Sequence, residues 1–377
     1  MRKLDGMKTM QGNVLLYQSK CISIMRAVWC TVVAFSYLHV CESAIKLPKD
    51  VKVPAILVFG DSVVDPGNNN YLKTIGKANF PPYGRDFEGG VPTGRYSNGK
   101  IPSDLLAEEI GIKELVPPYL DPSLQMSDLV TGVSFASGTS GYDPLSSELY
   151  NALSLADQLK LFKEYINKLK ATVGENRTSE IVSQSVYLVC AGSNDITNTY
   201  FVLPIRRWTY NVPAYTDMMV NWASTFIQEL YTLGARRIGV INAPPCGCLP
   251  SQRTLSGGLF RGCADELNQA AILFNGKLYT ELRSLNQTLP GSRLVYHDIY
   301  NPLMSLIMNP FQYGFAVTEK GCCGTGNIEV SFLCTRFNPG TCSDASKYVF
   351  WDSFHPTEAT YRMLVHQLVR KSVNGFF

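Results

Sequence analysis

Three short motifs carry side chains that together could perform nucleophilic catalysis. Gly60-Asp61-Ser62 supplies a hydroxyl, Gly192-Ser193-Asn194-Asp195 an amide, and Asp352-Ser353-Phe354-His355-Pro356 a carboxylate three residues before an imidazole. A serine hydroxyl is a weak nucleophile until a base removes its proton, and histidine suits this task because its pKa lies near neutrality. A carboxylate can orient the imidazole, and N–H donors can stabilise an oxyanion. The residue types therefore indicate acyl transfer.

The base follows by elimination among the four histidines of the chain. His39 lies in an apolar N-terminal segment, His297 follows an apolar run, and His366 lies within a helical pattern. Only His355 stands beside a carboxylate at short loop spacing, which is that of Asp352. Each motif alone is common, since Gly-Asp-Ser is usually a turn and Asp-x-x-His is often a capping arrangement or half of a metal site. Their order and placement give them weight.

Short apolar runs predict the strands that position these motifs. The runs at 55–59, 186–189, 238–241 and 294–296 are typical of buried parallel strands, and helical spacing marks 155–169, 218–230 and 361–368. Alternating strands and helices favour an α/β fold with a central parallel sheet covered on both faces. Ligands bind beyond the carboxyl ends of such strands. The first two motifs follow the first two runs, and Pro356 is expected in the first turn of the last helix.

Composition indicates a globular protein. The 377 residues are 45% apolar and 17% charged, and the formal net charge is only +3. No basic block is interleaved with aromatic residues, so nucleic-acid binding is not supported. There is no internal repeat or low-complexity linker, and we predict a single domain over residues 44–377.

The N-terminus resembles an export signal. Residues 27–40 are almost continuously apolar, Arg26 precedes them, and Cys41-Glu42-Ser43 follows with small residues. This span is shorter than the ~20 residues of a membrane helix, so we predict a signal peptide over residues 1–43. The preceding leader is long, which makes Met25 an alternative start. An uncleaved anchor is the competing interpretation.

Cysteine usage agrees with export. Three of the 11 cysteines lie in the targeting segment, and an even number remains: Cys190, Cys246, Cys248, Cys263, Cys322, Cys323, Cys334 and Cys342. An even count in an exported chain predicts disulfides, whereas the absence of a CxxC pair argues against zinc. Cys190 either stays free or pairs with Cys246. Two sequons predict glycosylation at Asn176 and Asn286.

Several ordered blocks carry a family resemblance. They read VFGDSVVDPGNNN (58–70), GVSFASGTSGYDPL (132–145), AGSNDI (191–196) and KYVFWDSFHPTEATY (347–361). The sequence resembles the plant GDSL esterase/lipase family of the SGNH hydrolase superfamily, especially its extracellular lipase branch. This resemblance covers nearly the whole chain after the N-terminal segment. It implies a three-layer α/β/α, flavodoxin-like fold around the parallel sheet.

The resemblance also assigns roles by position. It implies Ser62 as nucleophile and His355 with Asp352 as base and acid, and it places the oxyanion hole at Ser62, Gly138, Thr139 and Asn194. The family commonly has a Gly-Gly pair in its second block, where this chain has Gly138-Thr139. Its oxyanion glycine aligns with Thr139, whose backbone N–H can still donate although the branched side chain narrows the space.

Nearby polar residues have simpler interpretations. We expect Asp61 to close the turn after the first strand and Asp195 to support the Asn194 loop. Asp65 and the run at 68–70 are expected to form Asx turns. Phe201, Trp208 and Tyr210 either line an acyl groove or only cover the surface.

The expected function is that of a secreted serine esterase or lipase acting through an acyl-enzyme, with no metal or organic cofactor. Its partner would be a small-molecule or lipid ester, without nucleic acid and without a stable membrane span after signal cleavage. An acyltransferase or carbohydrate deacetylase using the same site is the alternative. A binding protein that has lost activity is a third hypothesis, which the intact triad disfavours.

Overall fold

Four buried parallel strands form the centre of the molecule. The computed structural model describes residues 51–376, apart from the side chains of residues 372–374. The strands are β1 (Ile56–Gly60), β2 (Val186–Cys190), β3 (Arg237–Ile241) and β4 (Arg293–His297), hydrogen-bonded in that order. Their register aligns Gly60, Cys190, Ile241 and His297 in one row at the carboxyl edge. All four predicted strands are confirmed.

A further segment extends the sheet beyond β1. Val58 N–H donates to the carbonyl of Val133 at 3.1 Å, and Phe135 N–H donates to the carbonyl of Val58 at 2.7 Å. This segment therefore runs parallel to β1 on the side away from β2. Counting it as the second strand in the chain gives the order 2-1-3-4-5, which is that of flavodoxin-like sheets. The apolar runs did not predict it, because small polar residues interrupt the segment.

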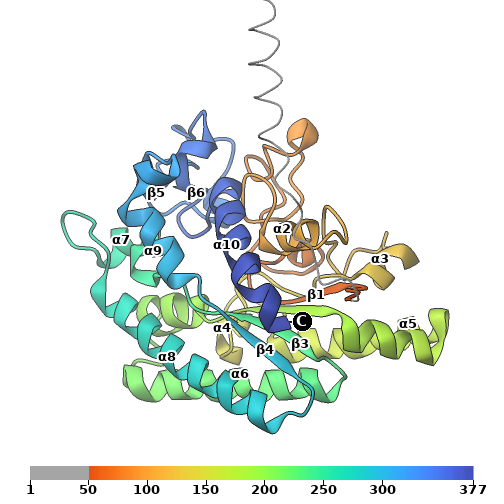
Figure 1. Ribbon diagram of the computed structural model, residues 1–377. Helices are drawn as coiled ribbons and strands as arrows, with labels where there is room; N and C mark the ends of the chain where they lie inside the picture. Colours follow the sequence, from red (N-terminus) through yellow and green to blue (C-terminus); the bar gives the residue numbers. More distant parts are fainter. Residues whose placement is uncertain (1–50, 377) are drawn as a thin grey trace, which may run out of the picture. The chain divides into compact units, whose positions relative to one another are not determined.

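Helices cover both faces of the sheet (Figure 1). Helices α5 (Leu155–Gln184), α6 (Val212–Thr232) and α8 (Asp265–Thr288) pack against one face, while α2 (Pro102–Glu109) and α10 (Glu358–Phe376) pack against the other. Because side chains alternate along a strand, Leu57 and Phe59 meet the first group of helices, and Val186 and Leu188 meet the second. The predicted three-layer architecture is confirmed.

Aromatic packing beneath the carboxyl edge holds β1 in place. The ring of Phe59 lies 5.0 Å from that of Phe135, 5.5 Å from Phe162 and 5.7 Å from Phe226. All four side chains are buried. Removing such a ring from a core costs about 3–5 kcal/mol, so this cluster fixes the end of β1 from below.

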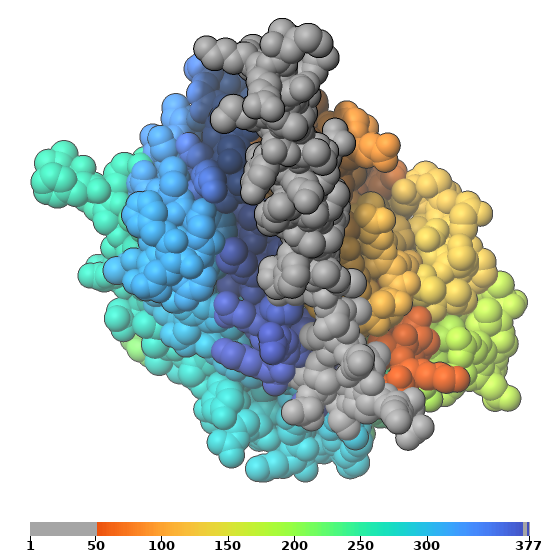
Figure 2. All heavy atoms as spheres, turned by 45° about the horizontal axis from the view of Figure 1, so that its top comes forward, coloured from red at the N-terminus to blue at the C-terminus, as the bar shows by residue number. Residues whose placement is uncertain are grey.

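The remaining elements lie around this core. They are α3 (Met126–Thr131), α4 (Pro144–Glu148), α7 (Pro250–Ser256), α9 (Tyr300–Met308), and a two-stranded parallel sheet of β5 (Val317–Gly321) and β6 (Tyr348–Phe350). The loop that follows α7 projects from the surface (Figure 2). No helix within residues 51–376 is both long and apolar enough to cross a membrane.

The entrance to α10 differs from the prediction. The helix begins at Glu358, not at Pro356, which pairs instead with Phe350 in an antiparallel bridge. Trp351 N–H donates to the carbonyl of His355 at 2.7 Å, so the chain turns back on β6 before the helix starts. Thr357 then caps the helix, since its hydroxyl accepts from Thr360 N–H at 3.4 Å. His355 is consequently held on a tight return and not on a free loop.

The described residues, 51–376, belong to one compact unit. The predicted signal peptide at 1–43, the alternative start at Met25 and the boundary at residue 44 lie outside the described residues. They remain predictions.

Candidate active site

The backbone turn after β1 presents Ser62 at the carboxyl edge. Gly60 has φ 134° and lies so close to the carbonyl of Cys190 that a Cβ atom would collide with it. The buried Gln158 side chain clamps this glycine, accepting from its N–H and donating to its carbonyl at 2.9 Å each. These constraints fix the turn and direct Ser62, which is 8% exposed, towards the space above the sheet.

Asp61 closes the same turn, as expected. Its Oδ1 accepts from Val63 N–H at 3.0 Å, and its Oδ2 accepts from the hydroxyl of Ser193 at 3.0 Å. The second contact ties the turn after β1 to the loop after β2. Burial raises the pKa of Asp61 to about 6, although these hydrogen bonds act to lower it.

Ser62, His355 and Asp352 form a continuous row, in which each side chain lies within hydrogen-bonding distance of the next. His355 Nε2 is 2.7 Å from Ser62 Oγ, and His355 Nδ1 is 2.8 Å from Asp352 Oδ2. Asp352 is fully buried and His355 is 5% exposed. The structure thus brings His355 and Asp352 beside Ser62, although Ser62 and His355 are 293 positions apart in the sequence.

The carboxylate decides the imidazole tautomer. An ionised carboxylate only accepts hydrogen bonds, so the Nδ1 atom that faces Asp352 must carry the proton. Nε2 then presents a lone pair to the hydroxyl of Ser62. Backbone N–H groups of Phe354 and His355 also donate to Asp352 Oδ1 at 2.8 and 2.7 Å, which holds the carboxylate in place. The arrangement can remove a proton from Ser62.

Asn194 lies beside these groups at the end of β2. Its Nδ2 donates to the carbonyl of Ser140 at 2.9 Å, and its Oδ1 accepts from Asn198 Nδ2 at 3.0 Å. An amide nitrogen has two protons, so this anchoring leaves one for a ligand. Asn194 lines the same cavity as Ser62 and His355.

Asp195 supports the Asn194 loop as expected. Its carboxylate accepts from the N–H groups of Tyr142 and Asp143 at 3.0 and 2.8 Å, and from Ser146 Oγ at 2.8 Å. Burial raises the pKa of Asp195 to about 7, and the charge of Asp143 adds to the increase.

The two residues of the Gly138-Thr139 turn have different surroundings. The N–H of Gly138 donates to Asp65 Oδ2 at 2.8 Å. The other carboxylate oxygen of Asp65, Oδ1, accepts from the N–H groups of Gly67 and Asn68, as an Asx turn requires. This corrects the expectation for Gly138, because its N–H is committed to a carboxylate. Thr139 borders the cavity with Ser62 and has φ 75°, a conformation in which its Cβ is unfavourable.

An apolar cavity of about 220 Å³ opens beside Ser62. Its walls come from distant parts of the chain and include Ile75, Tyr150, Val330, Phe332, Leu333 and Phe354. A smaller cavity shares Ser62, Asn194 and His355 with it. Two spaces that meet at the hydroxyl could receive the two halves of an ester.

The other candidates lie elsewhere. His297 is buried at the end of β4, where burial lowers its pKa to about 4, and His366 lies 3.4 Å from Glu109. Trp208 is 79% exposed and Phe201 borders a separate surface depression, so neither forms the cavity walls. Among the described residues, no group of three or more metal-binding side chains is clustered.

Within residues 51–376, three disulfides form: Cys248–Cys263, Cys322–Cys342 and Cys323–Cys334. Cys190 and Cys246 are buried and free, which resolves the alternative left open by the sequence.

Asn176 is exposed on α5, whereas the Asn286 amide exchanges hydrogen bonds with the backbone of Leu294 at 2.8 Å. The two sequons therefore offer different environments.

Sequence reasoning missed three organising side chains. Gln158 clamps Gly60, Asn69 Nδ2 donates to the carbonyl of Gly138 at 3.0 Å, and Tyr83 donates to Asp352 at 2.8 Å. Asn69 was expected only as a turn residue. Gln158 and Tyr83 carry no local signal, because their partners lie 98 and 269 residues away.

A parallel sheet with this arrangement at its carboxyl edge is the architecture of an ester-hydrolysing enzyme. A family model described as GDSL-like Lipase/Acylhydrolase matches residues 56–368. The chain belongs to this family. The predicted family resemblance is confirmed.

Two relatives come from Arabidopsis thaliana. GDSL esterase/lipase EXL3 is 54% identical over 334 residues, covering 89% of this chain and 92% of that protein. GDSL esterase/lipase EXL2 is 47% identical over 363 residues, covering 92% and 95%. A solved catalytic mutant of Axe2, an acetylxylan esterase from Geobacillus stearothermophilus, aligns over 86% of this chain and 96% of that one, with 12% identity. Its TM-score to this chain is 0.36.

Proposed function

We propose that this enzyme hydrolyses carboxylic esters with apolar acyl groups, with Ser62 as nucleophile, His355 as base and Asp352 as the supporting acid. The observation that carries the proposal is the 2.7 Å contact between Ser62 Oγ and His355 Nε2 at the wall of an apolar cavity. Membership of a lipase/acylhydrolase family supports the reaction class.

The reaction begins when Ser62 Oγ attacks the ester carbonyl carbon and its proton moves to His355 Nε2. Asp352 stabilises the resulting imidazolium through Nδ1. The tetrahedral intermediate collapses when His355 returns the proton to the leaving alcohol, which departs and leaves an acyl-enzyme. A water molecule, deprotonated by His355, then attacks the acyl carbon, releases the acid and restores Ser62.

The oxyanion would be held by three N–H donors: the backbone amides of Ser62 and Thr139 and the side-chain amide of Asn194. Gly138 is left out of this set because its N–H binds Asp65. Preorganised donors of this kind are each worth about 3–4 kcal/mol of transition-state stabilisation. No step in this scheme requires a metal or an organic cofactor.

The lining of the larger cavity supports an acyl chain of lipid type over an acetyl group on a sugar. Its side walls are mainly aliphatic and aromatic, with Asn198 and Ser331 among the polar exceptions, and removing an apolar chain from water into this lining is favourable. A carbohydrate deacetylase would need polar groups at this position to bind sugar hydroxyls.

The test is labelling with a fluorophosphonate and hydrolysis of p-nitrophenyl esters of graded chain length. We expect wild-type protein to be labelled, Ser62→Ala to be inert, and activity to rise from acetate to medium-chain esters. Equal labelling of both proteins would remove Ser62 from the mechanism. A preference for acetylated sugars would replace the lipid substrate with a carbohydrate, and ester products formed with added alcohols would indicate an acyltransferase.

We also infer that the protein is secreted. Three disulfides favour an oxidising compartment, and the apolar segment at 27–40 has the length of a signal-peptide core. The processed protein should begin near residue 44, with glycans at Asn176 and Asn286. N-terminal sequencing of protein recovered from the medium tests this, and a retained leader would contradict it.

A further inference from the structure

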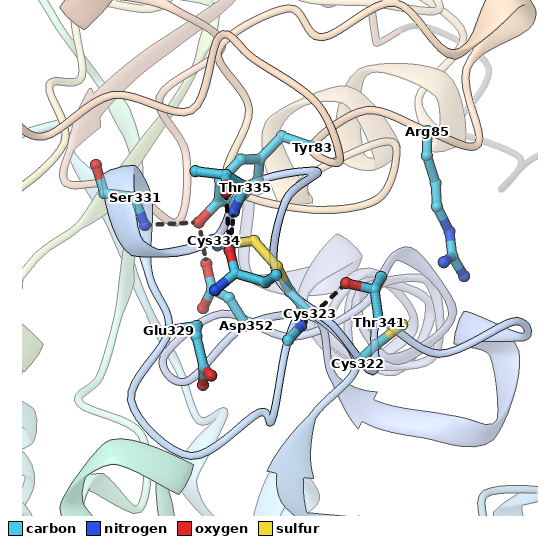
Figure 3. The surroundings of a disulfide bond; sticks show 12 residues. Tyr83, Arg85, Cys322, Cys323, Glu329, Ser331, Cys334, Thr335, Thr341 and Asp352 are labelled. Atoms are coloured by element: carbon cyan, nitrogen blue, oxygen red, sulfur yellow. Dashed lines mark hydrogen bonds between the residues drawn. A yellow bond between two sulfur atoms is a disulfide. The ribbon is translucent and has the colours of Figure 1, made fainter.

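The hydroxyl of Tyr83 lies between Asp352 and the loop that carries Ser331 (Figure 3). It donates to Asp352 Oδ2 at 2.8 Å and accepts from Ser331 N–H at 2.8 Å. The direction is fixed, because a backbone N–H can only donate and the phenolic proton must therefore go to the carboxylate. Tyr83 is fully buried, and burial together with the charge of Asp352 raises its pKa well above the usual range. The phenol thus stays a donor.

This contact joins Asp352 to a distant part of the chain. The two backbone N–H donors to Oδ1 come from Phe354 and His355, which belong to the same short turn as Asp352. Tyr83 approaches the other oxygen, Oδ2, which lies 2.8 Å from His355 Nδ1. Its hydroxyl therefore restricts rotation of the carboxylate and disperses charge on the oxygen nearest the imidazole.

Ser331 is itself held firmly. Its hydroxyl donates towards the carbonyls of Ile75 and Lys77 at 2.8 and 2.7 Å and accepts from Lys77 N–H at 3.0 Å. The residue has φ 52°, so these contacts hold it in a conformation that serine rarely adopts.

The disulfide between Cys323 and Cys334 closes the loop around Ser331. Cys334 N–H donates to the carbonyl of Ser331 at 2.8 Å, and Cys323 N–H donates to the carbonyl of Trp351 at 2.8 Å. One half of the disulfide therefore contacts Ser331, and the other contacts the neighbour of Asp352.

We propose that Tyr83 is a positioning residue for Asp352 and that the loop closed by Cys323–Cys334 fixes Tyr83 through Ser331. This inference rests on the proposed function, because it assigns Asp352 a role in the reaction. Ser331 also borders the cavity beside Ser62. The same hydrogen-bonded chain consequently links the wall of the substrate site to the acid that orients the base.

The test replaces Tyr83 by Phe, which keeps the ring that packs on Trp351 and removes only the hydroxyl. Tyr187→Phe is the matched control, since that tyrosine is equally buried and its hydroxyl donates to the carbonyl of Val182 at 2.8 Å, away from the site. We expect kcat to fall about 10-fold in Tyr83→Phe, as for loss of one hydrogen bond to a charged group, with KM within twofold. Tyr187→Phe should retain wild-type kcat.

The pH profile separates positioning from a general structural role. Without the phenolic donor, the carboxylate interacts more strongly with the protonated imidazole, so the acidic limb of kcat/KM should move to higher pH. The other titratable side chains near this pair, Asp61, Tyr96 and Tyr361, are unchanged in the variant. An unshifted limb with unchanged kcat would overturn the assignment of Tyr83. The proposed function would still stand if Ser62→Ala were inactive in the same assay, and it would fail if Ser62→Ala were active.

The disulfide is tested by a double-mutant cycle. Cys323→Ala/Cys334→Ala should lower kcat in the wild-type background and lower it by a smaller factor in Tyr83→Phe, because both changes release the same carboxylate. Equal factors in the two backgrounds would overturn the link between the loop and Tyr83. Should the disulfide variant not be secreted, Ser331→Gly serves instead, since glycine accepts φ 52° and the change removes the hydroxyl anchors. Ser331→Gly should likewise lower kcat by a smaller factor in Tyr83→Phe than in the wild-type background, and equal factors would refute the link between the loop and Tyr83.

Discussion

The N–H of Gly138 donates to Oδ2 of Asp65 at 2.8 Å. This buried carboxylate, which does not line the cavity beside Ser62, thereby sets the orientation of the turn whose next residue, Thr139, borders that cavity. Asp65 also organises its own loop through Oδ1. The orientation of the proposed oxyanion donor at Thr139 is therefore set by a buried carboxylate outside the cavity lining.

Asp65→Asn should disturb the Gly138-Thr139 turn without leaving a cavity, because the two side chains are nearly equal in size. The amide Oδ1 can still accept from Gly67 and Asn68, but Nδ2 would then face the N–H of Gly138, donor against donor. We expect kcat to fall about 10- to 100-fold, in line with a misplaced oxyanion donor. Steady-state kinetics on a soluble p-nitrophenyl ester measures this, and a variant with wild-type kcat would show that the Gly138 contact is dispensable.

Asp352→Asn should reverse the tautomer of His355. The amide Nδ2 would donate to Nδ1, which forces the imidazole proton onto Nε2, where it opposes the hydroxyl of Ser62. We expect kcat to fall by about 10⁴-fold with the fold retained. Circular dichroism verifies the fold, and Asp344→Asn, an exposed substitution, is the control. A loss below tenfold would argue against Asp352 as the supporting acid.

Thr139 should limit the size of the acyl group. A Cβ atom at Gly76 would lie 2.9 Å from Thr139 Cγ2, so the two residues pack directly against each other in the lining of the cavity beside Ser62. Thr139→Gly relieves the unfavourable φ and removes this methyl group, and we expect the ratio of activity on bulky to small acyl esters to rise several-fold.

Gly76→Ala supplies the matched test of that contact. In the wild-type background it should lower activity on all esters, whereas in the Thr139→Gly background the added methyl group has room and activity should recover. Competition between esters of graded chain length measures both variants. Identical effects of Gly76→Ala in the two backgrounds would disprove the steric interpretation.

Stability should increase on mild acidification. Burial raises the pKa values of Asp61 and Asp65 to about 6 and of Asp195 to about 7, above the 3.8 of a free side chain. The folded state therefore binds protons that the unfolded state has released, and the stability gained appears as pH falls through 7 to 6 and is complete below 3.8. His297, with a pKa lowered to about 4, opposes this trend below pH 6.5.

Asp61→Asn isolates one of these carboxylates. The amide can keep the contact with Val63 N–H and can donate to Ser193, so the main change is the lost buried charge. We expect its Tm to exceed that of wild type by a few degrees at pH 8 and by less at pH 5. Differential scanning calorimetry at both pH values measures this, with Asp344→Asn as surface control. A constant difference at the two pH values would exclude titration as the cause.

Local patterns were sufficient to predict the sheet and the position of Ser62. Apolar runs mark the four strands, and Ser62 and Asn194 follow two of them directly. The strand segment at 133–137 was not predicted, because Ser134 interrupts its apolar pattern. Ser134 is nevertheless buried, and its hydroxyl donates to the carbonyl of Val64 at 3.1 Å. Periodicity detects faces that are uniformly apolar, and this strand is not.

The supporting contacts could not be predicted, for a physical reason. Gln158 and Tyr83 act through hydrogen bonds to partners that lie 98 or more residues away in sequence and that only the folded chain brings near. The same holds for Gly138, whose N–H donates to the carboxylate of Asp65, 73 residues earlier, although the family resemblance implies an oxyanion role for the Gly138-Thr139 turn. Residue type and spacing identify the candidate reacting groups, whereas the contacts that hold them in place are a property of the tertiary structure.

The distance in sequence between Ser62 and His355 has a consequence for biosynthesis. The serine leaves the ribosome 293 residues before the histidine that would activate it. Throughout that interval the hydroxyl has no base and is as inert as that of any other serine. Under the proposed mechanism an incomplete nascent chain therefore cannot attack esters, and catalysis starts only after translation has passed residue 355 and that segment has folded onto the sheet.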